Sequence, residues 1–328
     1  MTCTCAYHDQ LIEIRRHLHT MPEEGWSEFT TTAFIVGKLR EYGYEVLLGK
    51  KVINPDNCLG RNLKVVEAGL KLARENGVSE ELLAEMDGLT GCVGVMDTGR
   101  PGPTLAIRFD IDCVPVTEST EDCHIPAREG FISKRPGLMH ACGHDAHTTC
   151  LLGAAKVLSA HRADFGGEVR FLFQPAEEIG QGARPLIAAG MLDGAQRVFG
   201  LHTASDLPAG TVGVKPGANN AGVDHFIIRI HGKSAHVSTP QLGVDALYIA
   251  SELVVALQSI VTRMTSPVEP VLIGVGKLNA GTAYNAVAET AVLEGTTRMF
   301  SPESRAHLRE TINAAAAHIS ALYGGTAE

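Results

Sequence analysis

Three short apolar runs, separated by a helix-like segment and loops, constrain the fold of this chain most strongly. The runs are TLAIRFD (104–110), EVRFLF (168–173) and RVFGLH (197–202), and their β-branched and aromatic residues are typical of strands. Between the first two, HTTCLLGAAKVLSAH (147–161) places Leu151, Ala155 and Leu158 on one helical face. Nearly continuous apolar strands alternating with helices predict an α/β fold, with a mainly parallel sheet covered by helices on both faces.

The length of 328 residues is enough for two domains of ordinary size. Residues 1–218 are predicted to form the first, with a helical insertion at about 50–90, and residues 219–328 the second. The second reads as a strand (224–232), a helix (244–262), two strands (271–278 and 286–298) and a helix (302–323). This βαββα order predicts a small α+β unit with one antiparallel sheet and two helices.

Charge and hydropathy exclude some classes of partner. A formal net charge of −9 disfavours a nucleic-acid partner, because phosphate binding requires a basic surface. No apolar run approaches the roughly 20 residues that span a bilayer. The N-terminus lacks the basic start and apolar run of a signal peptide. We therefore expect a cytoplasmic protein with no membrane partner.

Polar side chains follow each of the three predicted strands. Asp110 and Asp112 end the first strand, Glu177 and Glu178 follow the second, and His202 ends the third. In open α/β sheets, sites lie beyond the carboxyl ends of the strands, so these groups are expected to meet. The segment GLMHACGHDAHTT (137–149), which follows the first strand, adds a thiol and three imidazoles.

These residue types predict a metal site. Cys142 and His144 are two residues apart and would leave the same face of an extended segment. Thiolate and imidazole suit zinc, and imidazole with carboxylate also suits manganese. The alternative for Cys142 is a buried thiol, whereas His140 and His147 are expected to be hydrogen-bonded neighbours rather than ligands.

The adjacent glutamates can have different roles. One can bind metal while the other acts as a general base toward water beside it, which is the minimum for hydrolysing an amide. The alternative is a solvated acidic turn. A serine nucleophile is not indicated, because the sequence has no GxSxG, and a thiolate engaged by metal would not be available as a nucleophile.

The motifs RFDID, GLMHACGHDAHT, FQPAEE, GLHT, GKSAHVSTP and GTAYNAVAETAVLEGTTR occur in this order from residue 108 to residue 298. Together they resemble the aminoacylase/carboxypeptidase-G-like metallopeptidase family, and HACGHD resembles its amidohydrolase branch. Within that branch, the segment after GYEVLLGK and the PAGTV run are most similar to the A-subunit type of p-aminobenzoyl-glutamate hydrolase.

The resemblance implies two divalent ions, Mn²⁺ or Zn²⁺. Their ligands would be Cys142, His144, Glu178 and His202, with Cys142 bridging the ions. Glu177 would be the general base. Asp110 would orient a ligand, as carboxylates behind metal-binding histidines commonly do.

The resemblance also implies that residues 219–328 form an inserted lid and dimerisation domain, giving a homodimer or a heterodimer with a related subunit. His236 would polarise the scissile carbonyl in the partner's site, and Asn285 and Arg298 would hold the substrate carboxylate. Alternatively, His236 caps its own turn and Arg298 pairs with a surface acid.

The expected activity is metal-dependent hydrolysis of N-acyl or N-aroyl amino acids, with p-aminobenzoyl-glutamate as the preferred substrate. The alternatives are a hippurate-like substrate and a role as a non-catalytic partner subunit. The family pattern continues past the lid to a last histidine ligand, whereas this chain stops at Glu328. We therefore expect a truncated catalytic domain with exposed sheet edges.

Overall fold

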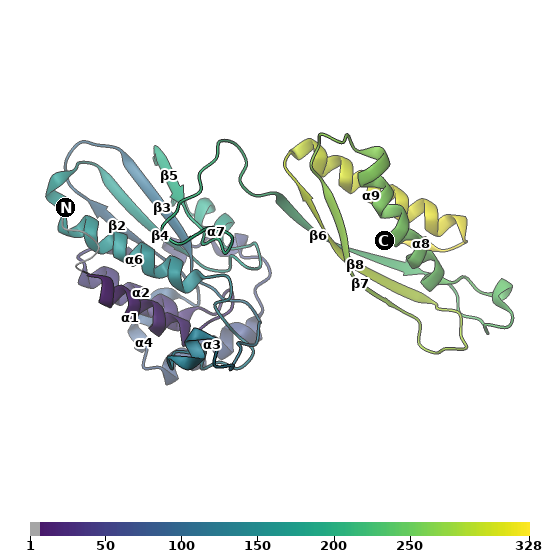
Figure 1. Ribbon diagram of the computed structural model, residues 1–328, viewed down its shortest axis with the longest axis horizontal. Coiled ribbons are helices and arrows are strands. Elements are labelled where there is room, and N and C mark those ends of the chain that lie inside the picture. The colour runs from purple at the N-terminus through teal and green to yellow at the C-terminus, as the bar shows by residue number, and fades with distance from the viewer. Residues whose placement is uncertain (1–6) are drawn as a thin grey trace. The chain divides into compact units, whose positions relative to one another are not determined.

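The computed structural model describes residues 7–328 and divides the chain into two compact units, Met1–Pro208 and Ala209–Glu328. Each unit has its own sheet and its own helices (Figure 1). The division falls in the segment between the last strand of the first sheet and the first strand of the second. The boundary predicted at residue 218 lies in the same segment.

The first sheet has the strand order β1-β2-β4-β3-β5. Its strands are β1 (Glu45–Leu47), β2 (Cys92–Asp97), β3 (Thr104–Asp110), β4 (Glu168–Gln174) and β5 (Arg197–Gly200). β3 pairs in parallel with both β4 and β5, β2 is antiparallel to β4, and β1 is antiparallel to β2. Only β2 therefore runs against the other strands, which confirms the predicted α/β class with a mainly parallel sheet.

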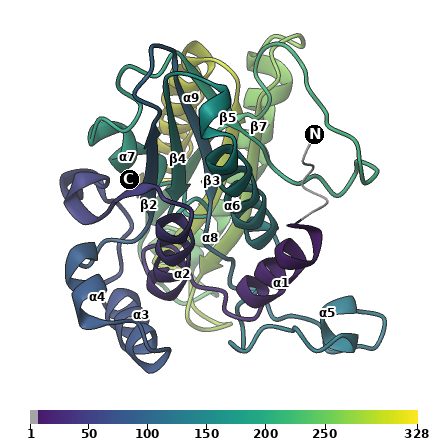
Figure 2. The ribbon, with the colours of Figure 1, turned by 90° about the vertical axis from the view of Figure 1, so that its left-hand side faces the viewer.

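The helices of the first unit lie on both sides of this sheet. They are α1 (His8–His19), α2 (Phe29–Glu41), α3 (Leu63–Glu75), α4 (Glu80–Met86), α5 (Ile125–Arg128), α6 (His144–Ala160) and α7 (Ala183–Ala188). α1, α2 and α6 pack together on one face (Figure 2). On this face the Tyr44 ring meets Phe171 of β4 and its hydroxyl donates to Ala155 O of α6. Arg170 points to the opposite face and donates to Met191 O, just after α7.

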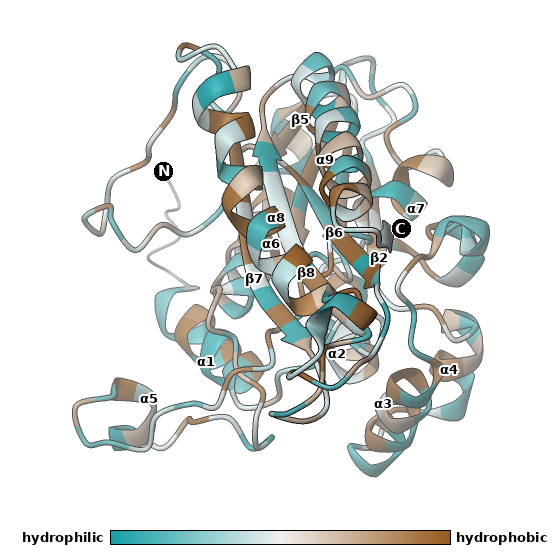
Figure 3. Cartoon of the chain, turned by 90° about the vertical axis from the view of Figure 1, so that its right-hand side faces the viewer, coloured by the Kyte–Doolittle hydropathy of each residue, from teal (hydrophilic) through white to brown (hydrophobic). Residues whose placement is uncertain are grey.

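The second unit has the predicted βαββα order, followed by one short strand. Its elements are β6 (Gly222–His231), α8 (Ala246–Ser259), β7 (Leu272–Ala280), β8 (Thr290–Met299), α9 (Pro302–Leu322) and β9 (Thr326–Ala327). The sheet is antiparallel with the order β7-β8-β6-β9. Polar residues are interspersed with apolar ones along α9, whereas α8 is mostly apolar (Figure 3). Leu253 and Leu257 of α8 and Leu293 of β8 are among the residues of its core.

α8 continues as a π-helical turn to Met264. This stretch, Ala246–Met264, is the one helix of the described residues that is long and apolar enough to cross a membrane, judged by length and composition alone.

β5 is an open edge of the first sheet. Among the described residues it pairs only with β3, and the side chains of Val198 and Phe199 are each 53% exposed. Exposed backbone next to apolar side chains favours association with other chains.

Candidate metal centre

The first unit brings the predicted metal ligands together at the carboxyl ends of its parallel strands. Asp110 ends β3, and His144 begins α6. Glu177 and Glu178 lie in the turn after β4, and His202 follows β5. Since β3, β4 and β5 run in one direction, their carboxyl ends meet at one edge of the sheet, as expected for this class of fold.

Cys142 and His144 converge for a different reason from the one that the sequence suggested. Their segment is not extended, because Gly143 is left-handed (φ 89°) and His144 is already the first residue of α6. A Cβ atom at Gly143 would lie 2.5 Å from Thr203 Oγ1. The left-handed backbone and this close approach both require glycine.

The His202 imidazole presents one nitrogen to Cys142. His202 Nδ1 donates to Thr203 O at 2.7 Å, which places the proton on Nδ1 and leaves a lone pair on Nε2. Nε2 lies 3.4 Å from Cys142 Sγ. The sulfur and this nitrogen are thus placed so that both could bind the same cation.

His144 is oriented in the same way by Asp112. His144 Nδ1 lies 3.3 Å from Asp112 Oδ1, and Asp112 Oδ2 accepts from Glu178 N at 2.9 Å. His144 Nε2 and Glu178 Oε1 are 3.5 Å apart, and within the described residues neither has a hydrogen-bond partner. Buried polar atoms normally have hydrogen-bond partners. A nitrogen and a carboxylate oxygen that lack them and face each other fit the ligands of a metal ion.

Asp110 contacts a different histidine from the predicted ligands. Asp110 Oδ1 accepts from His147 Nδ1 at 2.5 Å and lies 3.6 Å from His144 Nε2. His147 Nε2 accepts from the backbone N–H of Thr203 at 2.8 Å, so its lone pair is already used. His147 thus links Asp110 to the residue after His202 and is hydrogen-bonded, as predicted. The same prediction for His140 is wrong, because neither of its buried ring nitrogens has a hydrogen-bond partner among the described residues.

Electrostatics at the site match this arrangement. Burial opposes ionisation of Asp110, but the hydrogen bond from His147 and the charges of His144 and Arg108 lower its pKa to about 2. Burial and the neighbouring carboxylates, chiefly Glu178, raise the pKa of the Cys142 thiol to about 12. These carboxylates disfavour the thiolate form of Cys142. A cation bound among them would offset their charge and favour the thiolate.

The two glutamates differ in exposure. The Glu177 side chain is 35% exposed with Oε2 at 3.9 Å from His144 Nε2, whereas that of Glu178 is 22% exposed and lies closer. Burial and the charge of Asp110 raise the pKa of Glu177. Glu178 therefore faces the cluster, and Glu177 stands beside it with access to solvent.

Three groups of possible ligand atoms, each lying within 4.8 Å of one another, share His144. They are Cys142 with His144 and His202, His144 with Glu177 and Glu178, and Asp110 with His144 and His147. The structure thus brings together every metal-centre residue predicted from the sequence. Sequence reasoning gave no role to Asp112, although its spacing from Asp110 placed both carboxylates on one face.

The predicted lid residues lie in the second unit and are exposed. His236 Nδ1 accepts from Ser238 N at 3.2 Å, and Val237 N donates to Asn285 O, so His236 and Asn285 are neighbours. Arg298 lies near the far end of β8. Thr290 and Arg298 are eight residues apart, which corresponds to about 27 Å of strand. Ala286 pairs with His236 beyond the end of β6, where His231 faces Thr290, so Asn285 lies at the Thr290 end of β8. Asn285 and Arg298 of one copy therefore lie too far apart to hold the same carboxylate.

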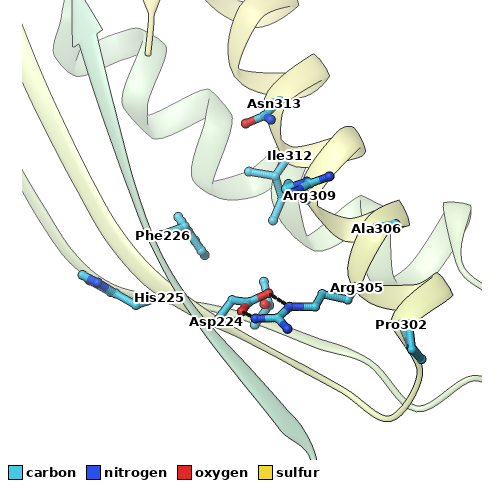
Figure 4. A pocket seen from close by; sticks show the side chains of 10 residues that line it. Asp224, His225, Phe226, Pro302, Arg305, Ala306, Arg309, Ile312 and Asn313 are labelled. Carbon is cyan, nitrogen blue, oxygen red and sulfur yellow. Dashed lines mark hydrogen bonds and ion pairs between the residues drawn. The ribbon is translucent and has the colours of Figure 1, made fainter. Parts of the chain in front are cut away.

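A cavity of about 510 Å³ opens between β6 and α9 (Figure 4). Arg305 Nε donates to Asp224 Oδ2 at 2.8 Å on its wall, and Arg309 and Asn313 also line it. None of the predicted lid residues is among those that line it.

Residues 106–323 match the family described as peptidase family M20/M25/M40. The chain is 40% identical over 314 residues to N-acetyl-L-cysteine deacetylase of Bacillus subtilis, covering 96% of this chain and 65% of that protein. It is 41% identical over 288 residues to a Haemophilus influenzae protein named as a homolog of the p-aminobenzoyl-glutamate hydrolase A-subunit, covering 87% of this chain and 67% of that protein.

A solved Bacillus subtilis structure, described as a dinuclear metal-binding peptidase of the M20 family, has a TM-score of 0.71 and 35% identity to this chain. The match covers 98% of this chain and 73% of that protein. The chain thus spans about two thirds to three quarters of the length of these relatives. The matched region, the identity to these relatives and the shared fold lead to one conclusion: the chain belongs to peptidase family M20/M25/M40.

Proposed function

We propose that this chain provides the metal centre of an amidohydrolase that cleaves the amide bond of N-acyl or N-aroyl amino acids. The observation that carries the proposal is the convergence of one thiol, two imidazole Nε2 atoms and the Glu178 carboxylate beside the more exposed Glu177. Relatives named as a deacetylase of N-acetyl-L-cysteine and as a p-aminobenzoyl-glutamate hydrolase homolog support the reaction class.

Two divalent cations, Mn²⁺ or Zn²⁺, are the proposed cofactors, and the dinuclear description of the Bacillus subtilis relative supports their number. Cys142, His144, Glu178 and His202 would hold them. Such cations lower the pKa of water and polarise a carbonyl group. The remaining chemistry falls to the residues of the chain.

Glu177 is the proposed general base. Its carboxylate reaches solvent and lies beside the cluster, so it can accept a proton from water and return it to the leaving amine. Asp112 contacts His144 directly and orients its imidazole. Asp110 acts less directly: it contacts His147, which in turn accepts from the N–H of Thr203, the residue after His202.

The length of β8 favours a dimer. A substrate carboxylate can meet both Asn285 and Arg298 only if they come from two copies, or from one copy and a related subunit. His236, next to Asn285, would then stabilise the developing oxyanion in the partner's site. The name of the Haemophilus relative, a homolog of one hydrolase subunit, leaves both homodimer and heterodimer as candidates.

p-Aminobenzoyl-glutamate is the preferred substrate, and N-acetylcysteine and hippurate represent the alternative of another N-acyl amino acid. The test loads the chain with Zn²⁺ or Mn²⁺ and measures metal content by mass spectrometry and release of each amino acid. Glu177→Gln should keep the metal content and lose turnover, whereas Glu178→Gln should lose both. Turnover that survives Glu177→Gln contradicts the role of the base.

A further inference from the structure

Two glutamates in the loop between α1 and α2 are completely buried. Glu23 and Glu28 are both 0% exposed. The Glu23 carboxylate accepts from the N–H groups of Thr30 and Thr31, at 3.1 and 2.7 Å, so it satisfies the first turn of α2. Local capping therefore explains Glu23.

Glu28 has no such local role. It occupies the N-cap position of α2, but its side chain makes no capping hydrogen bond. Instead, Oε1 accepts from Ala176 N at 2.8 Å, across 148 residues of sequence, and Oε2 accepts from Thr90 Oγ1 at 2.6 Å. Burying a carboxyl group is costly, so its contacts with this distant turn require an explanation.

The residue that Glu28 contacts has an unfavourable backbone. Ala176 is buried with a φ of 53°, in the left-handed region that residues with a Cβ atom avoid. Such a conformation persists where surrounding contacts impose it. The backbone at Gly25 also lies close to this turn, because a Cβ atom added at Gly25 would be 3.0 Å from Ala176 Cα.

The turn is anchored on both sides of the proposed base. Glu28 holds the N–H of Ala176, and Asp112 holds the N–H of Glu178 at 2.9 Å. Glu177 lies between these two anchored residues. Its backbone position is thus set by two buried carboxyl groups that belong to separate segments of the chain.

We propose that Glu28 is a positioning residue: through the N–H of Ala176 it holds the turn that carries Glu177 and Glu178 in register with the metal ligands. The inference rests on the function proposed above for these two glutamates. Glu28 itself touches neither the ligand cluster nor substrate, and it acts through the backbone of the turn.

The chemistry of Glu28 also indicates which substitution should preserve its role. Burial, followed by the charge of Asp112, raises the pKa of Glu28 well above its ordinary value. Glutamine has nearly the same shape and keeps an acceptor oxygen for the N–H of Ala176, so it is a conservative replacement.

The test compares four variants of the full chain loaded with Zn²⁺. Glu28→Leu keeps much of the volume and removes the anchor, Glu28→Asp shortens the reach by one methylene, and Glu28→Gln keeps the acceptor. Glu23→Gln is the matched control, since it alters a buried glutamate of the same loop without touching the turn. Zinc affinity is measured by competition with a chromogenic chelator, thermal unfolding by circular dichroism, and kcat and KM with the best substrate.

We expect Glu28→Leu and Glu28→Asp to weaken zinc binding about 10-fold or more and to lower kcat about 10- to 100-fold, with KM changed less than about twofold. Glu28→Gln should restore both values to within about threefold of wild type, and Glu23→Gln should change stability alone. Folded Glu28→Leu or Glu28→Asp protein with wild-type zinc affinity and kcat would overturn the inference. If Glu28→Leu does not fold, Glu28→Asp decides by the same criteria. If the wild type hydrolyses no N-acyl amino acid, the proposed function fails, and zinc affinity still tests the positioning role.

Discussion

The buried imidazole of His19 provides a quantitative test of the structure. His19 Nδ1 contacts Asp145 Oδ2 at 2.7 Å and Nε2 contacts Glu118 Oε1 at 2.8 Å, and the three side chains are 1%, 0% and 3% exposed. Both ring nitrogens therefore donate to carboxylates, which requires a protonated imidazole. This triad ties α1 to α6 and to the segment that carries α5.

Replacing His19 by leucine leaves two buried carboxylates without their shared cation. Breaking a buried ion pair in this way costs about 3–5 kcal/mol. We expect about 3 kcal/mol, because Asp145 keeps Arg15 and Glu118 keeps His124. For a unit of this size, that loss corresponds to a fall in Tm of about 6–12 °C.

The pH dependence of this difference has a definite sign. Burial opposes protonation of His19, but hydrogen bonds to Asp145 and Glu118 outweigh it and raise the pKa of His19 above 6.5. A raised histidine pKa gives stability that is full below pH 6.5 and is lost as pH rises through the folded-state value. The difference in free energy of unfolding between wild type and His19→Leu, here called the stability gap, should therefore be smaller at about pH 9 than at about pH 6.

The assay is thermal and urea unfolding of chelator-treated protein, followed by circular dichroism at both pH values. His161→Leu is the control, because the His161–Asp164 pair has a similar separation, 2.7 Å, but is 39% and 68% exposed. It should cost less than about 1 kcal/mol. A gap for His19→Leu below about 1 kcal/mol, or a gap that does not change with pH, would refute the reasoning.

Three further predictions concern the metal centre and the sheet edge. Asp112→Asn should weaken zinc binding about 10- to 100-fold with little loss of secondary structure, because it orients His144 and holds the turn after β4; unchanged affinity in a chelator competition would contradict this. Gly143→Ala should lower Tm and zinc affinity together, since φ is 89° and Thr203 leaves no room, whereas Gly137→Ala, also left-handed but with open space, should lower Tm alone. Phe199→Lys on the open β5 edge should reduce aggregation measured by light scattering without lowering Tm, because this side chain is 53% exposed; undiminished scattering would show that association occurs elsewhere.

The strands that carry the site were predictable because their pattern is local. TLAIRFD coincides with β3 (Thr104–Asp110), and EVRFLF accounts for all but the last residue of β4 (Glu168–Gln174). The predicted convergence needed only the rule that parallel strands end at one edge of a sheet. By contrast, β2 and its antiparallel pairing with β4 were not predicted, because nothing in its own sequence specifies its direction.

The residues that orient the metal centre depended on tertiary structure. Asp110 and Asp112 have the same spacing signal, and only the position of α6 assigns the first to His147 and the second to His144. Glu28 meets Ala176 across 148 residues, a pairing that no local pattern encodes. The sequence alone determined which groups gather at the sheet edge, because strand ends and residue types are local properties. Only the packed chain decided which group holds which, because hydrogen bonds between distant segments follow from how the helices and loops settle on the sheet.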